Sequence, residues 1–220
     1  MINAVLFDLD GTLLDRNRSL HAFIRDQYRR FQALQRMDEP LFIKRFIELD
    51  QRGYVWKDIV YQKLIEEFRL DMEWEPLLED YVQSFRHHCI GFANVIETLD
   101  DLKGMQLKLG MITNGMGQFQ MNTIRGLNIE GYFDAIVISE QVGLRKPDIR
   151  IFHHALACLD AEPHTSLFVG DHPVHDVDAS IHAGMKGVWK EDRAFGIAPS
   201  KPHRSIKNLR EIKEMLHLFE

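Results

Sequence analysis

The sequence predicts a doubly wound α/β fold: a parallel sheet whose chain is interrupted by an inserted α-helical segment. Two observations support it. After Gly91, short apolar runs alternate with segments of helical length, which is typical of parallel strands joined by helical crossovers. Between residues 17 and 88, apolar residues recur at helical spacing among dense charge. A chain of 220 residues has room for one sheet domain and one inserted subdomain.

The first predicted strand, residues 4–7, is a short apolar run that ends at the turn signal Asp10-Gly11. The helical insertion follows, with apolar residues at helical spacing at Phe42, Phe46, Leu49, Ile59, Leu64 and Phe68. We therefore expect an α/β core from residues 1–15 and 91–220, and a helical cap from residues 16–90.

The remaining elements are expected to alternate along the chain. The predicted strands are 107–112, 135–138, 166–169 and, as the last core strand, 187–189. The predicted helices are 118–126, 149–159, 174–182 and an amphipathic closing helix at 208–219. In open α/β sheets the ligand site lies beyond the carboxyl ends of the strands. The polar residues just after each apolar run are therefore the candidates for function.

Composition and charge argue against several classes of protein. The net charge of −6 gives no basic surface for a nucleic-acid backbone, so no polymeric nucleic acid is expected as a partner. Only Cys89 and Cys158 occur, without the spacing of a disulfide framework or a cysteine metal site. The N-terminus lacks the pattern of a secretory signal, and the apolar runs are too short to span a membrane. We expect a cytoplasmic protein without a membrane partner, as a monomer or homodimer.

The first strand is followed by Asp8-Leu9-Asp10-Gly11-Thr12. Two carboxylates one residue apart can supply one nucleophile and one proton-transfer group. Gly11 permits a tight turn beside them. The same residues also fit a surface turn with solvated acids.

The next two candidate segments each have an ordinary explanation as well. Thr113-Asn114-Gly115 follows the second strand, and its hydroxyl and backbone N–H groups can hold phosphoryl oxygens at a helix start. A helix cap or turn also explains it. Lys146, in Arg145-Lys146-Pro147-Asp148, can supply a point positive charge. A lone lysine is also common as a solvated surface group.

The fourth candidate segment runs from Gly170 to Asp176 and follows the strand 166–169. It carries Asp171 and Asp176 on a loop that leads into a helix. Carboxylate oxygens of this kind suit Mg²⁺, which binds through few carboxylates and keeps several waters. Helix capping is the alternative role for such acids.

Together and in this order, these residues resemble the haloacid dehalogenase-like (HAD) hydrolase superfamily. Asp8-Leu9-Asp10-Gly11-Thr12-Leu13 is similar to its first motif, Thr113 to the second, Lys146 to the third, and Gly170-Asp171 with Asp176 to the fourth. The resemblance covers the whole core, which in this family is a Rossmann-like sheet. The helical insertion lies where phosphatase-type members carry a type 1 cap.

The resemblance implies a magnesium-dependent phosphomonoester hydrolase that works through an aspartyl-phosphate intermediate. Its catalytic residues would be Asp8 as nucleophile, Asp10 as general acid and base, and Thr113 and Lys146 as the groups that hold the phosphoryl oxygens. Mg²⁺ would be held by Asp8, Asp171, Asp176 and the backbone carbonyl of Asp10. Asn114 is a further candidate for substrate binding.

Three other functions are compatible with parts of this pattern. A phosphomutase of the same superfamily keeps both acids of the first motif. A dehalogenase needs no proton donor for a halide and typically lacks the second acid, so Asp10 argues against it. A phosphorylatable receiver-like signalling protein also combines acids, a Thr and a Lys on a parallel sheet, but such a module is shorter and has no inserted cap.

The expected substrate is a small phosphorylated metabolite: a sugar phosphate, a phosphoglycolate-like acid or a nucleotide. The core motifs do not distinguish these, so we expect selectivity to come from the cap. Arg52 and Tyr54 are the candidates, because Gly53 breaks the helical pattern between charged and aromatic residues. An ordinary turn between helices explains this segment equally well.

Overall fold

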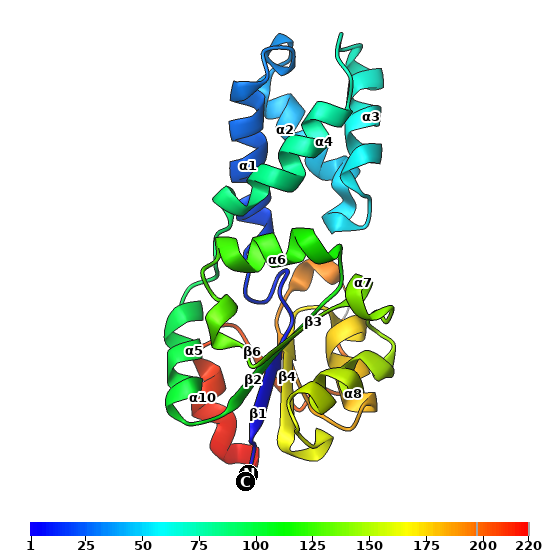
Figure 1. The fold of residues 1–220 in the computed structure, drawn as a ribbon. Coiled ribbons are helices and arrows are strands. Elements are labelled where there is room, and N and C mark those ends of the chain that lie inside the picture. Colours follow the sequence, from blue (N-terminus) through cyan, green and yellow to red (C-terminus); the bar gives the residue numbers. More distant parts are fainter. Residues whose placement is uncertain (197, 220) are drawn as a thin grey trace. The chain divides into compact units, whose positions relative to one another are not determined.

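The structure, a computed structural model, describes residues 1–196 and 198–219. The chain divides into two compact units. The sheet unit comprises Met1–Arg16 and Ile90–Glu220, and the helical unit comprises Asn17–Cys89. Figure 1 shows the elements of each unit, coloured along the sequence.

Within the described residues, the sheet has six strands: β1 (Ala4–Phe7), β2 (Lys108–Thr113), β3 (Ala135–Ile138), β4 (Ser166–Gly170), β5 (Lys186–Lys190) and β6 (Arg204–Ile206). They lie in the order β3-β2-β1-β4-β5-β6, and each neighbouring pair is parallel. This order is that of a doubly wound sheet, so the predicted fold class is confirmed.

The central strand β1 is apolar along its whole length because both of its faces are covered. Its residues, Ala4–Phe7, are fully buried. Phe7 pairs with Met111 of β2 and with Val169 of β4, so the carboxyl ends of these three strands lie within one or two residues of one another. The polar residues that follow them therefore meet at one edge of the sheet.

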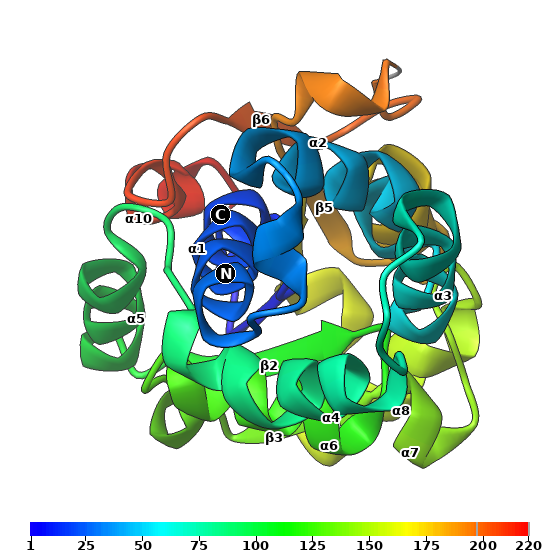
Figure 2. The ribbon, with the colours of Figure 1, turned by 90° about the horizontal axis from the view of Figure 1, so that it is seen from above.

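Helices cover both faces of the sheet. They are α5 (Val95–Gly104), α6 (Gly117–Gly126), α7 (Ser139–Val142), α8 (Ile149–Cys158), α9 (Ala179–His182) and α10 (Glu211–Met215). Figures 1 and 2 show α5 and α10 side by side, on the side of the sheet away from α8. Short 3₁₀ turns lie at Glu130–Tyr132, Pro163–Thr165, Arg193–Phe195 and Leu216–Phe219.

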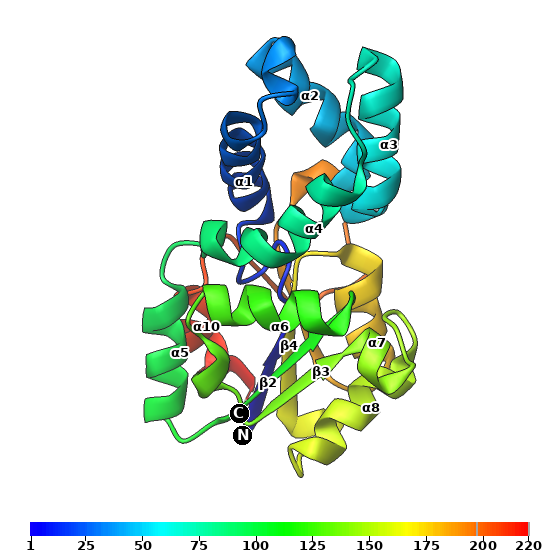
Figure 3. The ribbon, with the colours of Figure 1, turned by 45° about the horizontal axis from the view of Figure 1, so that its top comes forward.

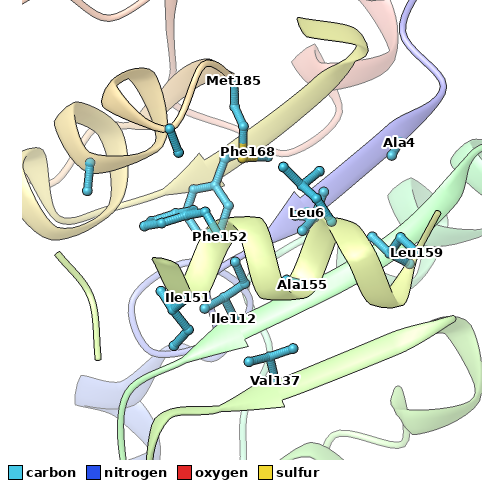
Figure 4. Close-up of a cluster of buried hydrophobic side chains, with 13 residues drawn as sticks. Ala4, Leu6, Ile112, Val137, Ile151, Phe152, Ala155, Leu159, Phe168 and Met185 are labelled. Carbon is cyan, nitrogen blue, oxygen red and sulfur yellow. The ribbon is translucent and has the colours of Figure 1, made fainter. Parts of the chain in front are cut away.

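The core between α8 and the sheet holds the site-forming strands in place. Figure 4 shows Phe152 of α8 beside Phe168 of β4, with Leu6 and Met185 close by. The two phenyl rings pack edge to face, with centroids 5.0 Å apart and planes at 74°. Burying one such ring contributes about 1.5–3 kcal/mol to folding.

Two predicted helices differ from the observed ones. The segment predicted as helix 174–182 begins as a π-helix over Pro173–Asp178 and continues as α9. His172 explains its start, because its ring Nδ1 accepts hydrogen bonds from the backbone N–H groups of Val174 and His175. The closing helix begins at Glu211 rather than 208, because the Glu211 carboxylate binds the N–H groups of residues 207 and 208 in a turn before it.

The prediction that 187–189 is the last core strand is wrong. β6 follows it and pairs in parallel with β5 at the edge of the sheet. β6 has only three residues, and Arg204 and Ser205 are exposed. Residues 204–206 contain no apolar run that would have predicted a strand, although Ile206 is buried.

The chain leaves and re-enters the sheet unit through a short antiparallel contact. The backbone N–H of Asp15 donates to the carbonyl of Ile90 at 2.8 Å, and that of Phe92 donates to Leu13 at 2.9 Å. Leu14 and Gly91 form an antiparallel bridge between them. The two ends of the insertion are thus tied together within the sheet unit.

The helical unit consists of α1 (Arg16–Arg30), α2 (Glu39–Asp50), α3 (Lys57–Phe68) and α4 (Glu75–Ser84), with 3₁₀ turns at Leu34–Arg36, Gln51–Gly53 and Phe85–His88. Figure 3 shows these helices. Its core is aromatic: the ring of Phe46 packs on Phe42 and on Tyr61, with centroids 6.3 and 5.4 Å apart. None of the described helices is long and apolar enough to cross a membrane.

A buried polar side chain ties three helices of the helical unit together. Gln27 of α1 is fully buried, and its Oε1 accepts the Tyr61 hydroxyl of α3 at 2.6 Å. Its Nε2 donates to the Leu77 carbonyl and to the Asp80 carboxylate of α4, both at 2.9 Å. Because each of these polar atoms is paired, the network specifies one packing of the helices.

Candidate active site

The loop after β1 presents Asp8 at the edge of the sheet. The Asp8 backbone N–H donates to the carbonyl of Val169 at 2.9 Å, so the loop begins as a continuation of the ladder. The Thr12 hydroxyl donates to Asp8 Oδ2 at 3.0 Å. With 6% of its surface exposed, Asp8 is nearly buried.

Two glycines let the acidic side chains approach the backbone. Gly11 has a φ of +88°, and a Cβ atom there would lie 2.0 Å from Oδ2 of Asp171. A Cβ atom on Gly170 would lie 2.3 Å from Cβ of Asp176. Any side chain at either position would therefore displace one of the carboxylates.

Asp8, Asp171 and Asp176 form a buried carboxylate cluster, with one ligand oxygen from each residue within 4.8 Å of the others. Burial raises the pKa of Asp8 to about 6, although Lys146 opposes the shift. Burial, followed by repulsion from Asp8 and Asp176, raises the pKa of Asp171 to about 9. The surroundings therefore do not compensate the negative charge that three ionised carboxylates would carry.

Lys146 supplies positive charge to the carboxylate cluster. Its Nζ lies 2.6 Å from Asp8 Oδ1 and 2.6 Å from Asp176 Oδ1, and the lysine is 3% exposed. Burial opposes its charged form, but Asp176 and Asp8 outweigh that effect and raise the pKa of Lys146. Lys146 is thus a cation at neutral pH.

The second acid, Asp10, lies outside the carboxylate cluster and has a different partner. Its Oδ2 accepts a hydrogen bond from Nε2 of Gln120 at 2.8 Å. The same nitrogen lies 2.7 Å from the Thr113 hydroxyl and 3.2 Å from the Asn114 carbonyl. Burial raises the pKa of Asp10, while Arg16 and the Gln120 hydrogen bond oppose the shift.

This geometry agrees with a comparison against known proteins. The sequence profile described as haloacid dehalogenase-like hydrolase matches residues 5–190. The chain belongs to the haloacid dehalogenase-like hydrolase family. The predicted family is therefore confirmed.

Three relatives illustrate the range of this HAD-like family. The pyrimidine 5′-nucleotidase YjjG of Escherichia coli is 29% identical over 194 residues, which are 84% of the chain and 82% of the relative. A HAD phosphatase from Thermococcus onnurineus has a similar solved structure, with a TM-score of 0.69, 26% identity and 98% of each chain covered. A 2-haloacid dehalogenase from Pseudomonas syringae has a TM-score of 0.68 and 26% identity, with 100% of each chain covered. Phosphatases and dehalogenases thus share this fold, and the site must distinguish them.

The residues of this HAD-like hydrolase fit a divalent cation of the magnesium type. Among the described residues, none donates a hydrogen bond to the Asp171 carboxylate, and Trp189 binds only its backbone carbonyl, at 2.8 Å. The three buried carboxylates have one lysine in contact with them, so a bound cation would balance negative charge that the lysine does not. Hard oxygen ligands of this kind are those that Mg²⁺ prefers.

Sequence reasoning placed five acidic or basic groups at one site, and the structure brings together Asp8, Lys146, Asp171 and Asp176. The Asp10 side chain is not part of that cluster, and coordination by its backbone carbonyl stays a prediction. Asp10 instead meets Thr113 through Gln120.

The Asn114 side chain has a structural task in this HAD-like hydrolase. Its Oδ1 accepts the backbone N–H of Lys146 at 3.0 Å, and its Nδ2 donates to the Lys146 carbonyl at 3.0 Å. This reciprocal pair holds the loop that carries the lysine. Contact of Asn114 with substrate stays a prediction.

Arg52 and Tyr54 belong to the helical unit. Gln51, Arg52 and Gly53 all have positive φ values, of 47°, 60° and 91°, and form a compact turn between α2 and α3. Tyr54 is 58% exposed. Their role in substrate selection stays a prediction.

Two polar residues of the site, Gln120 and Lys190, were not predicted from the sequence. Gln120 had no signal, because a glutamine on a helix is usually a solvated surface residue. Lys190, at the end of β5, donates to the Gly11 carbonyl at 2.9 Å, and its Nζ lies 3.3 Å from the centroid of the Phe92 ring. Its position after an apolar run at a strand end is the signal that could have identified it.

Gly170→Ala is expected to disrupt this site. The new Cβ atom would overlap Asp176 and force it away from Lys146 and from the His172 N–H, which now bind it at 2.6 and 2.9 Å. We expect the stability to fall by about 1–3 kcal/mol. Phosphatase activity should fall with it. Thermal unfolding and kcat/KM measure the two effects.

Gly104→Ala is the matched control for that substitution, because a Cβ atom on Gly104 would meet nothing within 4 Å. It should leave stability and activity close to those of the wild type. A Gly170→Ala protein with wild-type stability and activity would contradict the close approach seen here.

Proposed function

We propose that the chain is a magnesium-dependent phosphomonoester hydrolase that acts on a small phosphorylated metabolite through an aspartyl phosphate on Asp8. The observation that carries this proposal is the buried carboxylate cluster at the ends of β1 and β4, paired with Lys146. Such a site suits an anionic group that arrives with a cation and is attacked by a carboxylate.

In the first step a carboxylate oxygen of Asp8 attacks phosphorus in line with the leaving oxygen. The Asp8 oxygen–phosphorus bond forms as the bond to the leaving group breaks. Thr12 and Lys146 each bind one oxygen of Asp8, so its carboxylate plane is fixed before attack. With a pKa of about 6, Asp8 is mostly ionised at neutral pH.

Asp10 is the proton-transfer group of the proposed reaction. It donates a proton to the leaving oxygen, and then takes a proton from the water that attacks the aspartyl phosphate. A separate acid for this task distinguishes the proposed phosphatase from a dehalogenase, since a halide leaves without a proton. The pairing of Asp10 with Gln120, away from the carboxylate cluster, supports a role distinct from metal binding.

Mg²⁺ would be held by Asp8, Asp171 and Asp176, and when bound it would neutralise charge on the phosphoryl group. Lys146 lies within reach of the same region and holds phosphoryl oxygens together with the Thr113 hydroxyl. Lys146 is 3% exposed and Thr113 is 1% exposed, so their hydrogen bonds act away from bulk water.

A panel of phosphorylated metabolites, assayed for phosphate release with Mg²⁺ and again with excess EDTA, tests the proposal. We expect turnover of sugar, short-acid or nucleotide monophosphates that EDTA abolishes and Mg²⁺ restores. Nucleotides deserve inclusion because the relative from Escherichia coli is named as a pyrimidine 5′-nucleotidase. If no member of the panel is hydrolysed, or if activity stays full in EDTA, the proposed function is contradicted.

The phosphomutase alternative differs in its products. A mutase returns an isomeric phosphate ester and depends on a phosphorylated activator. The proposed hydrolase releases one inorganic phosphate per substrate without an activator, which a phosphate assay beside mass spectrometry of the organic product measures.

Arg52→Ala and Tyr54→Ala are expected to change the relative kcat/KM across the metabolite panel by about tenfold, because contacts to the non-reacting part of a substrate set selectivity. Hydrolysis of p-nitrophenyl phosphate should change less, since this small substrate makes fewer such contacts. Arg36→Ala, an exposed arginine in another turn of the helical unit, is the control. An unchanged ranking in both variants would direct the search to Arg16 and Arg18.

A further inference from the structure

Gln120 is a buried polar residue that the proposed mechanism does not use. It lies on α6, which Figure 1 shows at the end of the sheet toward which β1 runs. Its side chain is 2% exposed, whereas Gln118 on the same helix is exposed and bonds only Asn122. Gln120 therefore faces the site.

One nitrogen of Gln120 joins two groups that come from different strands. Nε2 lies 2.8 Å from Asp10 Oδ2, after β1, and 2.7 Å from Thr113 Oγ1, at the end of β2. An amide nitrogen has two N–H groups, which suffice for these two acceptors. The Asn114 carbonyl, at 3.2 Å, is the most distant of the three.

These hydrogen bonds constrain what Asp10 and Thr113 can do. With Oδ2 of Asp10 occupied by Gln120, its Oδ1 receives no hydrogen bond from the described residues. Thr113 accepts from Gln120, so its own hydroxyl hydrogen remains available for another acceptor. The free oxygen of Asp10 and the hydroxyl hydrogen of Thr113 are the atoms that the proposed reaction needs.

A purely structural role explains Gln120 poorly. Its Oε1 is buried and has no hydrogen-bond partner among the described residues. An unpaired buried acceptor costs stability that an apolar side chain of similar size would not. Turning the amide over would place Oε1 against the Asp10 carboxylate, so the contact with Asp10 fixes the orientation that leaves Oε1 unpaired.

We propose that Gln120 is a positioning residue, whose amide orients the carboxylate of Asp10 toward the leaving oxygen and the hydroxyl of Thr113 toward the phosphoryl group. The inference rests on the proposed function. In the step concerned, the bond from Asp8 to phosphorus forms, the bond from phosphorus to the leaving oxygen breaks, and the Asp10 proton moves to that oxygen. Gln120 takes no part in bond making and acts through the two groups it holds.

The test compares Gln120→Met, which keeps the length of the side chain and removes the amide, with Gln118→Met as the matched surface control. The substrates are phenyl phosphate and p-nitrophenyl phosphate, which have similar shape but different leaving groups. Phenolate is the stronger base and depends more on protonation as it leaves. kcat/KM is measured because it reports the step that expels the leaving group.

We expect Gln120→Met to lower kcat/KM for phenyl phosphate by about 100-fold and for p-nitrophenyl phosphate by about tenfold, since general acid catalysis contributes about 10²–10⁴-fold. Gln118→Met should stay within about twofold of the wild type on both substrates. A merely structural defect would lower both substrates equally.

Equal losses on the two substrates in a folded Gln120→Met protein, or no loss on either, would overturn the inference. If Gln120→Met is isolated unfolded by circular dichroism, Gln120→Asn takes its place, because it keeps a polar side chain too short for the contact with Asp10, and the same outcomes apply. A wild-type protein that hydrolyses neither these esters nor any member of the metabolite panel with Mg²⁺ would instead refute the proposed function, which separates the two failures.

Discussion

Asp8→Asn is expected to lower phosphatase turnover by about 10⁴-fold or more, because an amide nearly matches the carboxylate in shape but is a poor nucleophile. The fold should persist. Asp8 is one of three buried acids that repel one another, and burial already raises its pKa to about 6. Lys146 keeps its contact with Asp176 in the variant.

The same variant has an expected signature in stability. A carboxyl group whose folded pKa is raised above its value of 3.8 in the unfolded chain makes folding less favourable as pH rises from about 4 to about 6. Asparagine does not titrate, so in EDTA at pH 7 Asp8→Asn should unfold at a temperature equal to or above that of the wild type. Differential scanning calorimetry measures this.

Asp71→Asn, at an exposed acid of the helical unit, is the matched control for the Asp→Asn change, since it should keep full activity. A mock purification from cells that lack the protein gives the background phosphatase, and substantial steady-state turnover by Asp8→Asn above that background would refute the covalent mechanism. A mass increase of one phosphoryl group on the peptide that contains Asp8, trapped by acid quench in the wild type alone, would support it.

Asp171→Ala is expected to raise the Mg²⁺ concentration for half-maximal activity by about 100-fold or more, because changes even to groups around a ligand cost about 10–100-fold in metal affinity. Calorimetric titration of Mg²⁺ into the protein gives a second readout that does not need turnover. Asp176→Ala should also weaken binding, to a smaller extent, since Lys146 and the His172 N–H hold that carboxylate already. Unchanged Mg²⁺ affinity in Asp171→Ala would remove this residue from the metal site.

The raised pKa of Asp171 predicts how the free energy of unfolding of the metal-free protein depends on pH. In metal-free wild-type protein its folded pKa of about 9 lies above the unfolded value of 3.8, so between about pH 4 and pH 9 the folded state keeps a proton that the unfolded chain has released, and folding becomes less favourable as pH rises. The free energy of unfolding should therefore fall as pH rises through this window, and less steeply in Asp171→Ala. Urea unfolding in EDTA at pH 5.5 and 8 measures the difference in slope.

The strands and the carboxylates that follow them could be predicted because the signal is local. β1 and β3 have the predicted bounds, since each is an apolar run between turn residues. Parallel pairing then brings the ends of β1 and β4 together, and with them Asp8 and Asp171. The place of each residue just after an apolar run was enough to predict that Asp8 and Asp171 share one site.

Other features depend on contacts between distant parts of the chain. Gln120 becomes a site residue only because α6 packs so that its side chain meets Asp10, 110 positions away. The edge strand β6 has a single buried residue, Ile206, and forms because β5 offers an unpaired edge. The π-helix over Pro173–Asp178 depends on a histidine side chain that binds backbone N–H groups. None of these has a periodic pattern that a sequence could show.

The short antiparallel contact at Leu14 and Gly91 has a consequence for how this protein can change over evolutionary time. The sheet unit holds the two ends of the insertion together by its own hydrogen bonds, Asp15 to Ile90 and Phe92 to Leu13. Lengthening a segment whose ends are already closed costs little extra entropy, growing only with the logarithm of its length. Because the insertion also has its own aromatic core, one helical module can be exchanged for another at this junction while the carboxylates of the proposed site stay in place. Under the proposed function, the range of substrates can then change through replacement of the helical insertion, without a change in the residues of the sheet unit that carry the chemistry.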